Sequence, residues 1–327
     1  MKKVLITGGA GFIGSHMVDL LLSKNYSVRV IDNLITGKLE NLAHHTNNKN
    51  LIVDERDIRN LTPGDNLFKD INYICHFAGI GDIVPSIDKP TEYLSVNTQG
   101  TVNICEGARY NLINKLVYAA SSSCYGIAKV PTDENAKIVT EYPYALSKYL
   151  GECVVLHWNK VYKLPVNVIR IFNAYGTRSK TSGAYGAVFG VFLKQKLSGK
   201  SFTVVGDGTQ KRDFLYVTDV ANAFYKAFLT KREGQIYNLG AGKPQTINYL
   251  VKLLGGSAVN IEKRPGEPHI TWANISKIVN ELDWRPKVSF EEGVKNILDN
   301  IDYWKDAPLW NEKSIKEATK NWFNNLQ

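Results

Sequence analysis

The sequence predicts an α/β fold in which a doubly wound parallel sheet is followed by a smaller C-terminal α/β lobe. Short β-branched runs alternate with helical patterns through the first half of the chain. The strand runs are almost continuously apolar, as expected for a parallel sheet that helices cover on both faces. The 327 residues are enough for two domains. We expect the first domain to comprise residues 1–173, with segments returning from about 215–245, and the lobe to comprise mainly residues 174–327.

The elements of the first domain follow each other in a regular order. The predicted strands are Val4–Thr7, Ser27–Asp32, Leu51–Asp54, Tyr73–Ala78, Lys115–Ser121 and Val166–Phe172. The predicted helices are Phe12–Ser23, Glu92–Tyr110 and Tyr144–Tyr162. Because the strands are parallel, their carboxyl ends meet at one edge of the sheet, which is where ligands bind in such folds.

The pattern changes after Asn173. Gly176–Gly186 is rich in Gly, Ser, Thr and Lys and predicts a mobile loop. The remainder of the chain is predicted to contain the strands Phe202–Val205 and Ile236–Asn238 and the helices Val217–Leu229, Ile247–Leu254 and Phe290–Asp302, some of which return to the first domain. The last segment, Pro308 to Gln327, predicts a terminal helix that docks through Trp310, Trp322 and Phe323.

Composition excludes several classes of protein. The chain is 44% hydrophobic and 22% charged, and it has no apolar run of about 18 residues, so we expect no membrane-spanning helix. Its four cysteines are scattered, which predicts reduced thiols in the cytoplasm and no metal site. The net charge of +9 favours anionic partners such as nucleotides. Without a clustered basic run or a recognisable motif, we expect no nucleic-acid partner.

A glycine-rich loop separates the first strand from the first helix. Gly8, Gly11 and Gly14 form a G-x-x-G-x-x-G pattern that includes Phe12 and Ile13. Glycine allows a tight turn and a close approach of the backbone to a pyrophosphate, which then meets free N–H groups at the helix N-terminus. A glycine-rich turn without a ligand is the alternative, but the strand and helix on either side favour a dinucleotide-binding, Rossmann-type loop.

The second predicted strand ends in an acidic residue. A carboxylate at Asp32 can accept both hydroxyls of an adenosine ribose and repels a 2′-phosphate. Asn33 follows directly, and Lys38 is the only nearby cation, so NAD is favoured over NADP as the cofactor. The alternative role for Asp32 is to cap the turn.

A tyrosine and a lysine lie one turn apart at the start of a predicted helix. Tyr144 and Lys148 share a helix face, so the ammonium group can stabilise a tyrosinate. Lowering the pKa of a tyrosine from ~10 to neutral pH requires roughly 4 kcal/mol. Ser121 ends the preceding strand and can bridge a substrate oxygen and Tyr144. Tyr142 has Leu146 rather than a lysine one turn on, and is therefore not the candidate base.

In combination, these residues resemble the extended short-chain dehydrogenase/reductase family, in particular its NAD-dependent nucleotide-sugar epimerases and dehydratases. The resemblance extends from Lys3 to about Lys287. It implies roles for further residues. Those implied to contact the cofactor are Asp57, Ile58, Phe77, Ala78, Gly79 and Asn97. Those implied to contact a nucleotide-diphosphate sugar are Ser121, Ser123, Asn173, Arg212, Arg264 and Thr271.

The residues after the fifth predicted strand distinguish the reactions of this family. Its 4,6-dehydratases carry Thr-Asp-Glu, whereas this chain has Ser121, Ser122 and Ser123. A serine cannot replace a carboxylate as a base at neutral pH, so the resemblance implies a 4-epimerase acting through a transient 4-keto sugar. The 3,5-epimerase/4-reductases carry a cysteine at the position of Ser123. In this chain the cysteine comes one residue later, at Cys124, and we expect its side chain on the opposite face of the strand. A dehydratase, a net oxidoreductase and a non-catalytic NAD sensor are the alternatives.

Two positions bear on the substrate. Gly81 replaces a lysine frequent in galactose-type epimerases, and Thr271 replaces a bulky tyrosine that restricts some members to non-acetylated sugars. A smaller side chain leaves room for a 2-acetamido group, which favours a UDP-N-acetylhexosamine over a UDP-hexose. The resemblance also implies a homodimer formed through the two long helices of the first domain.

Overall fold

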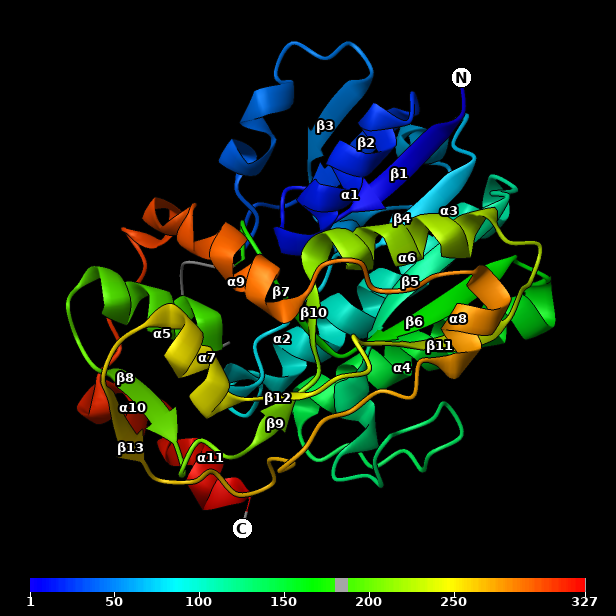
Figure 1. The fold of residues 1–327 in the computed structure, drawn as a ribbon. Coiled ribbons are helices and arrows are strands. Elements are labelled where there is room, and N and C mark those ends of the chain that lie inside the picture. Colours follow the sequence, from blue (N-terminus) through cyan, green and yellow to red (C-terminus); the bar gives the residue numbers. More distant parts are fainter. Residues whose placement is uncertain (180–187, 327) are drawn as a thin grey trace.

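A parallel seven-stranded sheet forms the centre of the structure, a computed structural model that describes residues 1–179 and 188–326 (Figure 1). The strand order is β11-β6-β5-β4-β1-β2-β3. From β1 the chain first adds strands on one side and then, from β4 on, adds them on the other side, as in a doubly wound fold. The strands are β1 (Lys3–Thr7), β2 (Ser27–Asp32), β3 (Leu51–Glu55), β4 (Tyr73–His76), β5 (Lys115–Ser121), β6 (Val166–Ile171) and β11 (Gln235–Leu239). The predicted fold class is confirmed.

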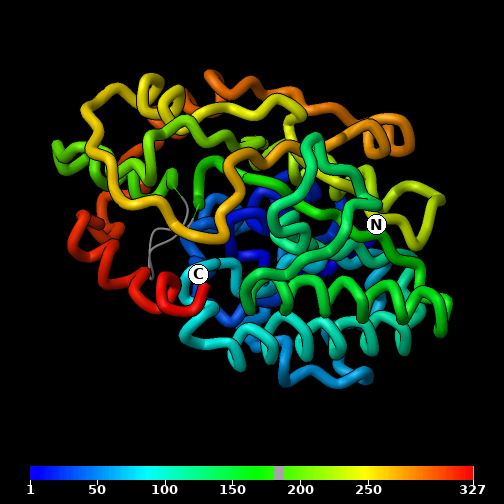
Figure 2. The backbone as a smooth tube through the Cα atoms, turned by 90° about the horizontal axis from the view of Figure 1, so that it is seen from below, coloured from blue at the N-terminus to red at the C-terminus, as the bar shows by residue number. Residues whose placement is uncertain are grey.

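Helices cover both faces of this sheet (Figure 1). On one face, α1 (Phe12–Ser23) packs beside α6 (Val217–Leu229) over a core that includes Phe224 and Tyr237. On the other face, α3 (Gly100–Tyr110) packs beside α4 (Pro143–Tyr162), and Figure 2 shows these two helices side by side. Burial on both faces explains why the strands carry few polar residues.

The lobe is built from short strand pairs and helices. Its strands are β7 (Asn173–Tyr175), β8 (Phe202–Val205), β9 (Lys211–Arg212), β10 (Phe214–Tyr216), β12 (Gln245–Thr246) and β13 (Ala258–Ile261). Its helices are α5 (Val188–Leu197), α7 (Ile247–Leu254), α9 (Phe290–Leu298), α10 (Glu312–Ala318) and α11 (Lys320–Asn325). The helix α8 (Ser276–Leu282) instead packs against β11 and α6 of the central sheet. An aromatic core that includes Tyr175, Phe214 and Phe290 joins β7, β10 and α9.

Several predicted elements differ in extent from the structure. The predicted helix Glu92–Tyr110 is three consecutive pieces, α2 (Pro90–Leu94), a π-helical turn Ser95–Gln99, and α3. The predicted helix Phe290–Asp302 ends at Leu298. Most of the predicted loop Gly176–Gly186 lies outside the described residues.

The prediction of one terminal helix is wrong, because the segment forms α10 and α11. Asn311 closes a capping box with Ser314 at the start of α10, and the C-cap of α10 at Thr319 is also the N-cap of α11. The segment does dock through an aromatic side chain, since Trp322 is 1% exposed and lies in the core of the lobe. Within the two described ranges, no helix is both long and apolar enough to cross a membrane.

Candidate active site

The glycine-rich loop forms a tight cradle between β1 and α1. Gly8 has a φ of +69°, and a Cβ there would lie 2.8 Å from the backbone nitrogen of Ala78. A Cβ on Gly14 would lie 2.1 Å from the carbonyl oxygen of Gly8. Gly11 is the N-cap of α1 and has no side chain to cap it, so the N–H groups of the first turn can bind an anion. Phe12 and Ile13 begin the helix itself.

Asp32 lies at the carboxyl end of β2, directly beside the glycine-rich loop. Its carboxylate accepts hydrogen bonds from the backbone N–H of Ala10 at 3.0 Å and of Leu34 at 2.9 Å. Burial raises the pKa of this group above its usual value. The two backbone bonds fix the carboxylate beside the glycine-rich loop.

A second acidic residue stands near the same rim. Asp57 accepts a hydrogen bond from the Asn33 side chain at 2.9 Å and pairs with Arg59 at 2.7 Å. The hydrogen bond from Arg59 lowers the pKa of Asp57 to about 2. Ile58, in contrast, is 4% exposed and packs beneath Gly100 in the core. Asp57 and Ile58 are both predicted to contact the cofactor, and of these two residues only Asp57 lies near the surface.

The end of β4 and the π-helical turn bring a second group of predicted residues together. Asn97 donates to the Ser147 hydroxyl at 2.9 Å and accepts from the backbone N–H of Ile80 at 2.8 Å. A Cβ on Gly79 would lie 2.8 Å from the Asn97 side-chain oxygen and 3.7 Å from the Lys148 Nζ. The backbone here therefore passes close to both side chains. The Ser147 hydroxyl was missed in the sequence, although it lies on the same helical turn as Tyr144.

The two residues before Gly79, Phe77 and Ala78, are also predicted to contact the cofactor, and they have different surroundings. Ala78 donates its backbone N–H to the Thr7 hydroxyl at 3.0 Å, which ties the end of β4 to β1 beside the glycine-rich loop. Phe77 packs on Phe224 of α6, with ring centroids 4.4 Å apart. Phe77 therefore serves the core as well as the rim of the cradle.

Tyr144, Lys148 and Ser121 meet at the carboxyl edge of the sheet. Tyr144 lies in the first turn of α4, Lys148 lies one turn later, and Ser121 is the last residue of β5 and hydrogen-bonds the Tyr144 side chain. The Lys148 Nζ stands 4.6 Å over the ring of Tyr118, and burial lowers the pKa of this lysine to about 7. Glu152, one turn further along α4, opposes this shift.

The pKa of Tyr144 differs from expectation. Burial raises it, and the hydrogen bond with Ser121 only partly opposes the shift. The protein's own groups therefore do not produce a tyrosinate at neutral pH, and a further positive charge is needed beside the phenol.

The hydroxyl-rich segment after β5 is a 3-10 turn, Ser122–Tyr125, rather than a continuation of the strand. Ser123 hydrogen-bonds the side chain of Tyr142. Cys124 is fully buried with Phe172 and Ala273, but it lies in this 3-10 turn and not on a strand, so the expected alternation of strand faces does not apply to it. Tyr142, set aside in the sequence, thus lies within the site.

The structure brings both predicted arginines to one carboxylate. Glu267 pairs with Arg264 at 2.8 Å and with Arg212 at 3.8 Å. Burial lowers the pKa of Arg212 below its usual value. Two half-buried guanidinium groups on neighbouring segments suit a diphosphate, whose oxygens accept bidentate hydrogen bonds. Nearby, Thr271 donates to the side-chain oxygen of Asn173 at 2.6 Å, so these two predicted residues are also neighbours.

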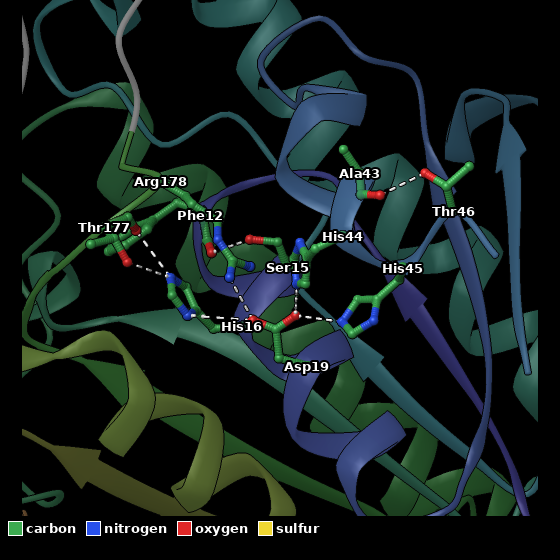
Figure 3. A network of polar contacts seen from close by, with 10 residues as sticks. All are labelled: Phe12, Ser15, His16, Asp19, Ala43, His44, His45, Thr46, Thr177 and Arg178. Carbon is green, nitrogen blue, oxygen red and sulfur yellow. Dashed lines mark hydrogen bonds and ion pairs between the residues drawn. The ribbon is translucent and has the colours of Figure 1, made fainter. Parts of the chain in front are cut away.

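A polar network away from this site contains the one group of metal-binding side chains found within the described ranges (Figure 3). Asp19 of α1 accepts hydrogen bonds from His44 at 2.7 Å and His45 at 2.8 Å, and it pairs with Arg178 at 2.6 Å. The guanidinium already balances the carboxylate charge, and hydrogen bonds account for both imidazoles. We assign this network a structural role in joining α1 to the segment that follows β7.

The fold and site define a class of protein: a dinucleotide-binding α/β protein with a tyrosine–lysine pair at the carboxyl edge of its sheet. The model of the NAD dependent epimerase/dehydratase family matches residues 4–240. The chain therefore belongs to this NAD-dependent family.

Similar proteins align with nearly the whole chain. A protein from Methanocaldococcus jannaschii, named for UDP-glucose 4-epimerase, is 36% identical over 90% of this chain and 97% of its own. The crystal structure of UDP-glucuronic acid 4-epimerase from Bacillus cereus, with UDP-glucuronic acid and NAD, has a TM-score of 0.86 and 30% identity, and covers 92% of this chain and 99% of its own. The structure of UDP-N-acetylglucosamine 4-epimerase from Methanobrevibacter ruminantium, in complex with UDP-N-acetylmuramic acid, has a TM-score of 0.85 and 30% identity. It covers 91% of this chain and 99% of its own.

Proposed function

We propose that the protein is an NAD-dependent 4-epimerase of a UDP-hexose or UDP-N-acetylhexosamine that acts through a transient 4-keto sugar. The observation that carries this proposal is the hydrogen-bonded pair of Tyr144 and Ser121 beside Lys148, with serines instead of carboxylates in the adjoining turn. The pair can move a proton to and from a sugar hydroxyl. Without carboxylates at positions 122 and 123, the turn lacks the acid and base for eliminating water.

The residues of the cradle fit the cofactor of the family. At Gly8 and Gly14 the backbone packs so closely against itself that neither position admits a Cβ, and the Asp32 carboxylate lies beside this turn. We propose that the first turn of α1 holds the pyrophosphate, that Asp32 and Asn33 hold the adenosine ribose, and that Lys148 holds the nicotinamide ribose. NAD, when bound, supplies a reversible hydride acceptor and a positive charge near Tyr144.

In the proposed reaction the protein moves one proton out and back. The Tyr144 phenolate takes the proton of the sugar 4-hydroxyl while Ser121 holds the oxygen by a hydrogen bond, and Lys148 stabilises the phenolate. Arg212 and Arg264 keep the diphosphate fixed while the 4-keto sugar rotates. Tyr144 would then return the proton to the C4 oxygen of the sugar once its opposite face has been turned to the site.

The choice of sugar follows from the size of the pocket residues. Thr271 is bonded to Asn173, so a short side chain stands where a bulky one would narrow the sugar site. This supports an N-acetylhexosamine, because a 2-acetamido group needs that room. We propose that residues 174–327 form most of this sugar-nucleotide lobe.

We further propose that the active protein is a cytoplasmic homodimer that pairs through α3 and α4. Exposed apolar side chains on and beside these helices support this arrangement: Tyr110 is 66% exposed, Leu112 is 86% exposed and Val161 is 49% exposed. The described cysteines are free thiols, as in a reducing compartment. Light scattering on the purified protein tests the dimer, and a monomer at micromolar concentration would contradict it.

The activity is tested by incubating the protein with UDP-N-acetylglucosamine or UDP-glucose and following inversion at C4 by NMR. We expect inversion with the wild type and a loss of at least about 100-fold in kcat for Tyr144→Phe, which lacks the proton-transferring hydroxyl. A stable 4-keto-6-deoxy product would instead identify a dehydratase. Sustained accumulation of NADH would identify a net oxidoreductase.

A further inference from the structure

The C-terminal helix α11 contacts the proposed substrate site through one buried side chain. Trp322 donates its indole N–H to the carbonyl oxygen of Pro265 at 3.0 Å. Pro265 directly follows Arg264, and the same turn ends at Glu267, which pairs with both arginines. The indole is 1% exposed, so the bond is shielded from water and holds this turn in one position.

The same indole also contacts the other wall of the site. The ring of Trp322 lies 5.1 Å from that of Tyr142, which is the N-cap residue of α4. Tyr142 in turn hydrogen-bonds Ser123, and its ring is parallel to that of Tyr144 at a centroid distance of 6.5 Å. One tryptophan from the end of the chain thus touches both the arginine-bearing turn and the residue beside the proposed proton-transfer pair.

Two contacts upstream of Trp322 hold the terminal segment in this place. Asn321 donates its side-chain amide to Asp88 at 2.7 Å, which ties α11 to the segment leading into α2. Figure 2 shows the red C-terminal helix beside this cyan segment. Further upstream, the carbonyl oxygen of Trp310 accepts a hydrogen bond from Gln195 of α5 at 2.9 Å. The terminal segment is therefore anchored to two separate parts of the chain.

We propose that α11 completes the sugar-nucleotide site, with Trp322 as a positioning residue for the arginine-bearing turn and Tyr142 as a specificity-determining contact to the sugar. This inference rests on the proposed function. Trp322 acts through its neighbours: its N–H fixes the turn of Arg264, and its ring limits the rotation of Tyr142. Tyr142 presents a neutral hydroxyl and an aromatic face between the proton-transfer pair and the arginines, where the sugar ring lies in the proposed complex.

The first experiment separates these roles with Trp322→Phe, which removes the N–H donor and keeps an aromatic ring. We expect the Kd for UDP, measured by calorimetry, and the KM for the UDP-sugar to rise about tenfold, which corresponds to about 1.4 kcal/mol. The effect on kcat should stay within about threefold, because Tyr144 and Ser121 do not depend on this bond. Phe323→Leu, on the next residue of α11, is the matched control and should leave both constants unchanged.

The second experiment uses Tyr142→Phe, which keeps the ring and removes the hydroxyl. We expect the ratio of kcat/KM for UDP-N-acetylglucosamine to that for UDP-glucose to change at least fivefold, with UDP binding unaltered. This variant tests the role of Tyr142 whether or not Trp322→Phe folds, as judged by circular dichroism. An unchanged ratio overturns the role of Tyr142, and a UDP Kd within twofold of wild type in Trp322→Phe overturns that of Trp322. A wild-type protein that binds UDP but inverts no sugar would instead refute the proposed function.

Discussion

A buried ion pair between α4 and β6 gives a sharp test of how the helix of Tyr144 is held. Arg170 and Glu152 form two hydrogen bonds, at 2.5 Å and 2.9 Å, and their side chains are 3% and 2% exposed. Arg170 also donates to the Tyr125 hydroxyl at 2.7 Å. Glu152→Gln preserves the shape of the side chain but leaves the guanidinium buried without a countercharge. Removing one partner of a buried pair costs about 3 to 5 kcal/mol.

The assay is urea denaturation followed by circular dichroism. With an m-value of about 3 kcal/mol/M, the expected loss lowers the midpoint by about 1 to 1.7 M. The control is Asp299→Asn, because Asp299 pairs with Lys295 at 3.2 Å on the surface, where the side chains are 58% and 76% exposed. That change should cost no more than about 0.5 kcal/mol. A loss below about 1 kcal/mol in Glu152→Gln would show that water reaches the pair and would refute the reasoning.

Three further predictions concern the buried histidines, Gly14 and Asp32. Burial lowers the pKa of His16 to about 4 and of His76 to about 3, so both are neutral in the folded protein and the unfolded chain binds more protons below pH ~6.5. Stability should therefore be complete above that pH and fall as the pH decreases from 6.5 towards 4; equal urea midpoints at pH 7.5 and 5 would contradict this. Gly14→Ala should weaken NAD binding at least about tenfold, because its Cβ would meet the Gly8 carbonyl at 2.1 Å, whereas Gly64→Ala has no atom within 4 Å and should bind normally in the same fluorescence titration. Asp32→Asn should lower the preference for NAD over NADP, measured as a ratio of Kd values, and an unchanged ratio would show that the carboxylate does not contact the ribose.

Local patterns were sufficient for much of the fold and for the place of the glycine-rich loop. The strands of the sheet were found from apolar runs, and the glycine-rich loop from its place between a strand and a helix. Tyr144 and Lys148 lie one turn apart on α4, as expected, because residues at this spacing share a helix face whatever else the helix touches. The terminal helix was misjudged, since the break between α10 and α11 depends on capping at Asn311 and Thr319 rather than on the apolar pattern.

The burial and the polar neighbours of these residues could not be predicted from the sequence. The pKa of Tyr144 is raised because neighbouring elements bury the phenol, and burial is a property of packing. Tyr142 was set aside because its i+4 partner is Leu146, yet its relevant neighbours, Ser123 and Trp322, lie on other elements.

The sequence by itself determined the alternation of strands and helices, the place of the glycine-rich loop and the one-turn spacing of Tyr144 and Lys148, because each depends on residues within a few positions of one another. Only the tertiary structure decided that Arg212 and Arg264 share Glu267, and that Trp322 reaches the turn at Pro265. Such contacts join segments that are distant along the chain, and their geometry is set by the packing of the lobe against the sheet rather than by any periodicity of the sequence.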